Sequence, residues 1–565
     1  MTAKISSGPC AFLFLAILAV LSASSLANGA AVSFSTVPGL LAFFGTCLVA
    51  RILFSVDFKG MERWTLAAAE LLCIFECVLG LLQIMGLVRS NHGLFLLTGT
   101  FGNPGPFGGL VGVIGVMAAV HVWRNRNAFS GNGLSWPGSW PVMLSLVTTA
   151  LTVVVLPASM SRAAWLSAAV ALLVFASAEL GLKVWIRRHR VLSVTSAVVA
   201  VVLLAGMFVF KRDSAVGRLH IWHMELRAIA NHPLLGVGPE NGMGAYGIAQ
   251  EEYFRAKPRS AVELRAAGCP EYAFNEYLKF GVQGGIFCLL LVAALAVVSI
   301  ITLLKFGSVL AYGITAFSVF AFFSYPLSCL PLVLLLAVFL AAAGSIPGRA
   351  PEAGKGSEAK PAVPLVPTVL LLSLAFLAIL FFTGARYKAY RSALSEWKSS
   401  QHLRALEMFG DQAEVLAPLH GSLQSDMRYL YDYGYALHKT DRYGESNAIL
   451  SEGALISCDP MFHDIMGKNW EATGRYDKAE AEYLRAHYMV PGRLYPYILL
   501  MEMASRRGDT ESAVGYARKA LALPVNSRNL AMVDLHNRAD TCLVRLLEGN
   551  GYQEPFNAEA EPERK

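Results

Sequence analysis

The chain has 565 residues, of which 55% are hydrophobic and only 15% are charged. Soluble globular domains carry about 25% charged residues, so this composition excludes a fully soluble protein. The formal net charge of +7 is modest. Basic loops between membrane spans are enough to explain it, and we expect no nucleic-acid partner.

The apolar residues concentrate before residue 385, in runs of about 18 to 25 residues that can cross a hydrocarbon core. Backbone polar groups inside that core must bond within their own segment, so the runs predict helices and an all-α fold. About eleven spans are expected: 10–28, 37–56, 64–87, 106–123, 140–157, 163–185, 191–210, 284–304, 308–326, 327–344 and 365–384.

The first of these runs could also be a cleaved signal peptide, because only Lys4 precedes it and Ser25, Leu26 and Ala27 follow it. We favour an uncleaved span, since further spans follow closely.

Basic residues in short loops predict the orientation of the spans. If the spans alternate, one side carries most of them: Arg51, Lys59, Arg63, Arg124, Arg126, Lys183, Arg187, Arg188, Arg190, Lys305, Arg349, Lys355 and Lys360. The other side holds little more than Arg89 and Arg162. The sequence therefore predicts a cytoplasmic amino terminus, with the large loop 211–283 and the carboxy-terminal part on the opposite side.

These patterns divide the chain. We expect a polytopic membrane domain at 1–344, a flexible cytoplasmic linker at 345–364, a last span at 365–384, a soluble helical domain at 385–550 and a disordered tail at 551–565. The linker is rich in Pro, Gly, Ala and charge and cannot build a core.

The helical domain contains a repeat. Thr440-Asp441-Arg442-Tyr443 recurs as Thr473-Gly474-Arg475-Tyr476 and, more weakly, as Arg507-Gly508-Asp509-Thr510, at spacings of 33 and 34 residues. The units also share small residues (Ala448, Ala481, Gly515) and closing prolines (Pro460, Pro491, Pro524). This period resembles the tetratricopeptide repeat, which implies stacked helix pairs and a concave surface for a possible protein partner.

Nine cysteines are scattered along the chain. Cys73 and Cys77 share a helix face, where packing is a better explanation than metal binding because no further ligand has the right spacing. A disulfide between Cys458 and Cys542 is possible if the helical domain lies outside the cytoplasm.

Two arginines are the first candidates for chemistry. Arg162 directly follows the fifth span, and Arg218 begins the amphipathic stretch 218–230, which we expect to lie on the membrane face. Arg162 could simply anchor its helix at the interface. A guanidinium can also grip two oxygens of a phosphate or anionic lipid at once.

Two polar segments lie beside predicted spans. Asn103 sits in a Gly- and Pro-rich turn (98–106), for which a structural role is as good an explanation as ligand contact. Asn275 and Glu276 precede the eighth span, where a partly desolvated carboxylate suits a general base, although an acid at a helix amino terminus is also stabilised by the dipole.

Five segments, in this order, resemble the O-antigen ligase and polymerase superfamily of membrane glycan transferases. They are GTFGNPGPFGG before the fourth span, SRAAWL at the sixth, RLHIW…NHPLLGVGPENG in the large loop, AFNEYLKFGVQGG into the eighth, and FSYPL at 323–327. The resemblance implies an all-helical fold of about twelve spans in the bacterial inner membrane, with a large periplasmic loop. It also implies transfer of a glycan from undecaprenyl diphosphate to a lipid or protein acceptor, with no metal or other cofactor because the diphosphate is the leaving group.

The same resemblance implies roles for particular residues. Arg162 and Arg218 would bind the diphosphate. Many ligases have His-Asn where this chain has Phe274-Asn275, so the role of that histidine would pass to Glu276, His220 or His232. Other substrate contacts are expected from Trp222, Asn275 and Asn103.

An O-antigen ligase-like glycosyltransferase is therefore the favoured function, with a polymerase or a protein O-oligosaccharyltransferase as alternatives. Two further hypotheses stay open. A transporter of lipid-linked glycans would need intramembrane charge, for which Glu70, Glu76 and Glu179 are the candidates. A non-catalytic scaffold would use the repeats to recruit partners.

Overall fold

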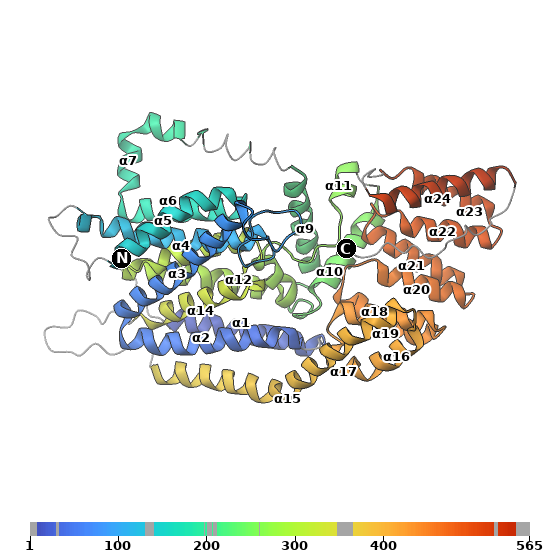
Figure 1. Ribbon diagram of the computed structural model, residues 1–565, viewed down its shortest axis with the longest axis horizontal. Coiled ribbons are helices and arrows are strands. Elements are labelled where there is room, and N and C mark those ends of the chain that lie inside the picture. Colours follow the sequence, from blue (N-terminus) through green and yellow to red (C-terminus); the bar gives the residue numbers. More distant parts are fainter. Residues whose placement is uncertain are drawn as a thin grey trace.

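The computed structural model describes residues 8–29, 33–129, 140–196, 198–199, 206, 212–258, 260–346, 365–524 and 529–549. These residues form helices and no strands, which confirms the predicted all-α fold. In Figure 1 the apolar helices lie on the left and the carboxy-terminal helices on the right, with α9 to α11 between them.

Seven of the described helices are long and apolar enough to cross a membrane, so the chain is a membrane protein. They are α1 (Gly8–Ala27), α2 (Val37–Val56), α3 (Phe58–Ile84), α4 (Pro104–Arg124), α5 (Trp140–Ala158), α6 (Arg162–Glu179) and α12 (Glu276–Phe306). Two shorter apolar helices are α13 (Leu310–Phe323) and α14 (Leu330–Ser345). Helix α15 (Leu365–Ala405) is bent by 46° and would be the eighth span if its two parts form one.

The expected count of eleven spans is not established. The expected spans at 308–326 and 327–344 correspond to the two shorter helices, and most of the expected span at 191–210 lies outside the described residues. Short helices complete this part: η1 (Phe34–Thr36), η2 (Arg126–Phe129), α7 (Leu182–Arg188) and η3 (Pro326–Ser328).

Helix α4 lies at the centre of the apolar bundle because glycines let its neighbours approach. A Cβ on Gly109 would lie 2.4 Å from the Phe320 ring of α13, and one on Gly115 would lie 2.3 Å from Thr152 of α5. The Gly-rich sequence of α4 therefore serves close helix packing, which places α5 and α13 directly against it.

One end of the bundle is closed by a polar cluster that joins four helices. Arg124 of α4 pairs with Glu179 of α6 at 2.5 Å and donates to the carbonyl of Gly307 at 2.8 Å, just after α12. The hydroxyl of Tyr312 in α13 also donates to Glu179, at 2.5 Å. These charged partners satisfy one another at the helix ends, opposite the ends where α4, α6 and α12 begin.

The large loop folds into α9 (Arg212–Asn231), α10 (Gly242–Ala256) and α11 (Ala261–Ala266). Helix α9 is buried along His220, Ile221, Met224, Glu225, Ala228 and Ile229, while Leu219 and Leu226 are exposed. The buried side of this helix therefore includes the polar residues His220 and Glu225, and two of its leucines face away from the rest of the protein.

The carboxy-terminal part begins with α16 (Phe409–Leu416), η4 (Ala417–Leu419) and α17 (His420–Leu423). Three helix pairs follow: α18 (Met427–Lys439) with α19 (Tyr443–Ile456), α20 (Met461–Ala472) with α21 (Tyr476–Met489), and α22 (Tyr495–Arg506) with α23 (Thr510–Leu521). Helix α24 (Leu530–Leu547) packs last. We call residues 409–524 and 529–549 the helix-pair domain.

The turn within each pair has the same backbone conformation. Asp441, Gly474 and Gly508 have φ values of 59°, 73° and 74° at the places where the repeated motif lies. Two of the three are glycines because this left-handed region disfavours a side chain. The repeated motif therefore marks the turns between paired helices.

The small residues that pack between the paired helices are not the ones expected. Ser446, Ala479 and Ala513 are fully buried, whereas the expected Ala448 and Ala481 are exposed. A shift of two residues turns a helix by about 200°, which carries the expected positions to the opposite face.

Candidate functional site

Three of the motifs meet at Arg218. This half-buried side chain of α9 donates from Nη1 to the carbonyl of Phe323 at 2.9 Å. Its guanidinium also lies over the ring of Phe274, 4.9 Å from the centroid. The large loop, the entry to α12 and the end of α13 thus hold one cation between a carbonyl and an aromatic face.

Arg162 lies close enough to Arg218 for their charges to interact. Arg162 is the first residue of α6, and its Nη2 donates to Ser214 of α9 at 3.3 Å. Burial, and then the charge of Arg162, lowers the pKa of the Arg218 guanidinium below its ordinary value. The structure therefore brings together the two arginines on which the predicted mechanism depends.

The start of α6 is positioned by the Gly-rich start of α4. A Cβ on Gly108 would lie 2.8 Å from Cβ of Ser161, so glycine lets the two chains touch there. The indole of Trp165 donates to the carbonyl of Leu156 at 2.8 Å and ties α6 to α5. These contacts hold Arg162 at the beginning of its helix.

A cavity of about 240 Å³ lies beside the arginines. Its wall is shared by α9, the turn before α10, the entry to α12 and the end of α13. The residues that line it are Glu225, Pro239, Glu240, Gly242, Met243, Glu271, Tyr272, Ala273, Phe274, Asn275, Glu276, Lys279, Val282, Gln283, Ser324, Tyr325 and Ser328. Phe274, which contacts Arg218, is thus also part of the cavity wall.

Glu276 lies in this cavity, as its expected role requires. Its Oε1 accepts from the backbone amide of Leu327 at 2.9 Å, and its Oε2 lies 3.5 Å from Nζ of Lys279. The carboxylate is 4% exposed. It therefore joins the entry of α12 to the turn after α13, in the wall of the cavity.

Glu225 is the functional candidate that sequence reasoning missed. It is 1% exposed, lines the same cavity, and its Oε1 has no hydrogen-bond partner among the described residues. Burial raises the pKa of this carboxyl to about 8, and the charge of Lys279 opposes the shift. A usable signal was its position seven residues after Arg218, which puts both side chains on one helix face.

Aromatic rings form the wall between the arginines and the acids. Tyr272 stacks on Tyr325 with ring centroids 4.0 Å apart, and Phe274 meets Tyr325 edge to face at 5.3 Å. The backbone of Phe274 has a φ of 51°, which is strained for a bulky residue. That conformation turns the Phe274 ring under Arg218, at the position where the resemblance expects a histidine.

The two predicted histidines do not line this cavity. Nε2 of buried His220 lies 2.8 Å from Oε1 of Gln250, and the ring packs near Tyr253 and Phe254. Burial lowers the pKa of His220 below its ordinary value. His232 is exposed after the end of α9.

The other three predicted substrate contacts have local partners. Asn275 and Asn103 are helix amino-terminal caps, which accept from the amides of Leu278 at 3.0 Å and Gly105 at 2.8 Å. Trp222 packs against Phe322 and Phe323, with ring centroids 5.4 and 5.8 Å away. Of the three, only Asn275 lines the cavity.

The Gly-rich turn of the large loop packs against the backbone of α12. The amides of Val237 and Gly238 donate to the carbonyls of Val282 and Gln283 at 2.9 and 3.0 Å. This contact lies next to Gly285, where α12 is kinked with a φ of 78°. The turn thereby places Glu240 in the cavity wall.

The carboxylates proposed for a transport path are held in structural bonds. Glu76 accepts from Thr100, and Glu70 accepts from Ser145 at 2.5 Å. Glu179 belongs to the polar cluster with Arg124. Nothing in these contacts forms a continuous polar path through the described helices.

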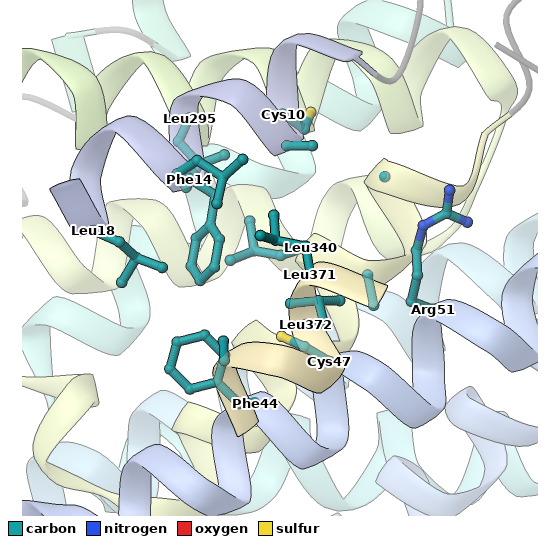
Figure 2. Close-up of a pocket in the computed structure, with 15 residues that line it drawn as sticks. Cys10, Phe14, Leu18, Phe44, Cys47, Arg51, Leu295, Leu340, Leu371 and Leu372 are labelled. Atoms are coloured by element: carbon teal, nitrogen blue, oxygen red, sulfur yellow. The ribbon is translucent and has the colours of Figure 1, made fainter. Parts of the chain in front are cut away.

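A second cavity, of about 80 Å³, lies among α1, α2, α12, α14 and α15. Figure 2 shows its apolar lining, with Leu340 and Leu371 near the middle of the view, Phe14 and Phe44 on the left and Arg51 on the right. None of the predicted site residues lines it, so it is separate from the candidate site.

Fold and site together define a polytopic helical membrane protein with two arginines beside an acid-lined cavity. Comparison with protein-family models matches residues 147–293 to the family described as O-antigen ligase. The matched segment runs from α5 to the middle of α12 and includes Arg162, Arg218 and the four glutamates that line the cavity. It supports an O-antigen ligase- or polymerase-like membrane glycosyltransferase. No curated protein matches the chain.

Proposed function

We propose that this protein transfers a glycan from a polyprenyl diphosphate, undecaprenyl diphosphate being the expected donor, to a hydroxyl acceptor. The observation that carries the proposal is the pairing of Arg162 and Arg218 beside the cavity, within the segment that matches O-antigen ligases. Two fixed guanidinium groups can bind the diphosphate and stabilise the negative charge that grows on it as it leaves.

The acid-lined cavity is the proposed acceptor site. Its four carboxyl groups, from Glu225, Glu240, Glu271 and Glu276, face a single cation, Lys279, among the lining residues. Such a wall disfavours a diphosphate and suits a neutral hydroxyl that must lose a proton. Glu276 and Glu225 are the two candidates for taking that proton, whereas His220 would have to act from outside the cavity.

We also propose the orientation. The ends at which α4, α6 and α12 begin would face the periplasm, and the cluster around Arg124 would face the cytoplasm of a bacterial inner membrane. The helix-pair domain would then be a periplasmic tetratricopeptide-like domain. Among the possible reactions we favour ligation, and polymerisation or protein O-glycosylation are the alternatives.

Alanine substitution of either arginine tests the mechanism. We expect R162A and R218A each to lower glycan transfer by about 100-fold or more, because a charge-stabilising group is lost. R218K should recover only part of the rate, because an ammonium cannot bind two oxygens side by side. Transfer is measured with purified protein, a polyprenyl-diphosphate glycan and candidate acceptors.

The matched control is R89A, since Arg89 is exposed and follows α3 at the same end of the bundle. This variant should transfer glycan at the wild-type rate. Unchanged transfer by R218A, with normal insertion into the membrane, would remove the proposed mechanism. A glycan blot of a deletion strain would separate the three reactions, by whether lipopolysaccharide, chain length or glycoprotein changes.

A further inference from the structure

Two cysteines far apart in sequence meet where the helix-pair domain touches the large loop. The Sγ atoms of Cys269 and Cys458 are 2.9 Å apart, although 189 residues separate them along the chain. Cys269 lies between α11 and α12, and Cys458 lies between α19 and α20. Sulfur atoms in a disulfide are about 2.05 Å apart, so only a small approach would bond them.

The backbone on both sides of this pair is held by close packing. A Cβ on Gly247 of α10 would lie 3.1 Å from Cα of Cys458, and one on Gly244 would lie 1.9 Å from the carbonyl oxygen of Leu455. The amide side chain of Gln250 donates to the carbonyl of Met489 at 2.5 Å. These contacts fix Cys458 against the loop.

The two thiols differ in access. Cys458 is 1% exposed and packs in an apolar cluster with Ile221, Met224 and Tyr246, whereas Cys269 is exposed. A reagent from solution can therefore reach Cys269 first, and Cys458 is in place to react with it from the inside.

We propose that Cys269 and Cys458 form a disulfide that fastens the helix-pair domain to the loop carrying Arg218. The proposal rests on the orientation proposed above, because disulfides persist outside the cytoplasm. It assigns a covalent modification site to the interface and is independent of the glycan that the protein transfers.

The chemistry needs a protein disulfide of the oxidising compartment as its oxidant. The Cys269 thiolate attacks that disulfide, forms a mixed disulfide and releases one thiolate. Cys458, losing its proton, then attacks Sγ of Cys269 and displaces the second thiolate. Two thiols of this chain lose two protons and two electrons in total, and the oxidant becomes a dithiol.

The other cysteine pairings are less well placed. Cys542 lies in α24, in a separate apolar cluster with Ala517 and Leu546. Cys73 and Cys77 lie one turn apart in α3, with sulfurs 4.0 Å apart inside the apolar bundle. Cys542 therefore provides a matched control from the helix-pair domain.

The test is peptide mapping of the full-length protein, purified without reductant after free thiols are blocked with N-ethylmaleimide. Trypsin should release residues 266–279 and 443–468 as one disulfide-linked species that reductant separates. C269S and C458S should abolish this species, and C542S should leave it unchanged. Free, maleimide-labelled Cys269 and Cys458 in the wild-type protein, or a linked Cys458–Cys542 peptide, would overturn the proposal.

Labelling of intact cells with a membrane-impermeant maleimide separates this proposal from the proposed orientation. Labelling of Cys269 only after reduction supports both. Labelling without reduction keeps the orientation and overturns the disulfide. Labelling only after lysis places the loop inside the cell and overturns the orientation together with the disulfide, while the glycan-transfer assay of R218A still tests the mechanism.

Discussion

Glu225 is the cavity residue whose protonation can be tested most directly. Its carboxyl is fully buried in the cavity wall, and its pKa is raised from 4.5 to about 8. At neutral pH most Glu225 carboxyls therefore carry a proton, and the ionised form, which is the one able to act as a base, becomes more common as the pH rises toward 8. Glu276, by contrast, is bonded to the backbone of Leu327 and paired with Lys279.

This shift predicts how stability depends on pH. Between pH 4.5 and about 8 the native carboxyl keeps a proton that the unfolded chain has released, so stability falls as pH rises, by up to roughly 1.4 kcal/mol per pH unit. E225Q has no such proton and should lose less stability over this range. Thermal midpoints in detergent at pH 5, 6, 7 and 8 measure the difference.

The matched control is E252Q, because Glu252 is exposed on α10. This variant should keep the wild-type pH dependence. Equal slopes for E225Q and the wild type would contradict the assigned protonation of Glu225.

A second comparison separates the two glutamates in catalysis. If Glu225 takes the acceptor proton, E225Q should lower kcat by about 10²-fold or more, the usual effect of losing a general base, and flatten its pH profile. E276Q should then cost less. The reverse order would assign the proton transfer to Glu276, and kcat against pH for the three proteins decides between them.

Most of the residues at the candidate site could be found from the sequence, but their contacts could not. Arg162 and Glu276 were candidates because each lies at the edge of an apolar run, and Arg218 was a candidate because it begins an amphipathic stretch. Glu225 was missed, because its place on the helix face of Arg218 does not show that this face is buried, which depends on contacts with α10 and α12. The predicted histidine role had no geometric support, because packing with Gln250 holds His220 in a different cluster.

At the scale of elements, α10 is the surface on which the helix-pair domain rests. Gly244 leaves no room for a side chain against Leu455, and Arg485 of α21 lies 3.3 Å from Glu251. Apolar periodicity predicted the helices of both parts, and the repeated motif predicted the turns between paired helices. Neither pattern contains the contact between them, which depends on where glycines fall on one face of α10.

Replacing Gly244 tests that contact. G244A should weaken docking by about 1–3 kcal/mol, because a Cβ would overlap the Leu455 carbonyl and force the helices apart. Hydrogen exchange of the α10 and α19 amides should become faster, while exchange in α22 and α23 stays unchanged.

The control is G217A, because a Cβ on Gly217 of α9 meets no atom within 4 Å. Alanine there should be neutral or stabilise the helix by up to about 1 kcal/mol. If hydrogen exchange in G244A stayed at the wild-type rate, the contact between Gly244 and Leu455 would not be what holds the helix-pair domain against α10.

At the scale of the whole molecule, basic residues and site arginines lie at opposite ends of the bundle. Arg124 and Arg126 follow the end of α4, whereas Arg162 begins α6, where Ser161 contacts Gly105 at the start of α4. The bias of basic loops predicted this separation correctly for these helices. The number of spans could not be predicted as well, since apolar runs of similar composition form helices of 14 to 31 residues.

Single cysteines test the orientation. In a Cys269→Ser background, which removes the exposed thiol, R89C should react with an impermeant maleimide in intact cells and R126C should not. Both side chains are exposed at opposite ends of the bundle. After lysis both should react, and labelling of R126C alone in intact cells would reverse the proposed sidedness.

The cluster around Arg124 has a mechanical consequence. It fastens α4, α6, α12 and α13 at one end, while Arg162 begins α6 and Glu276 begins α12 at the opposite end. Because the polar cluster holds these helices together at one end, we expect any separation of the helices to be larger at the opposite end. A slight separation of the helix ends at the site would admit a bulky lipid carrier from the bilayer and release it while the contacts around Arg124 stay formed.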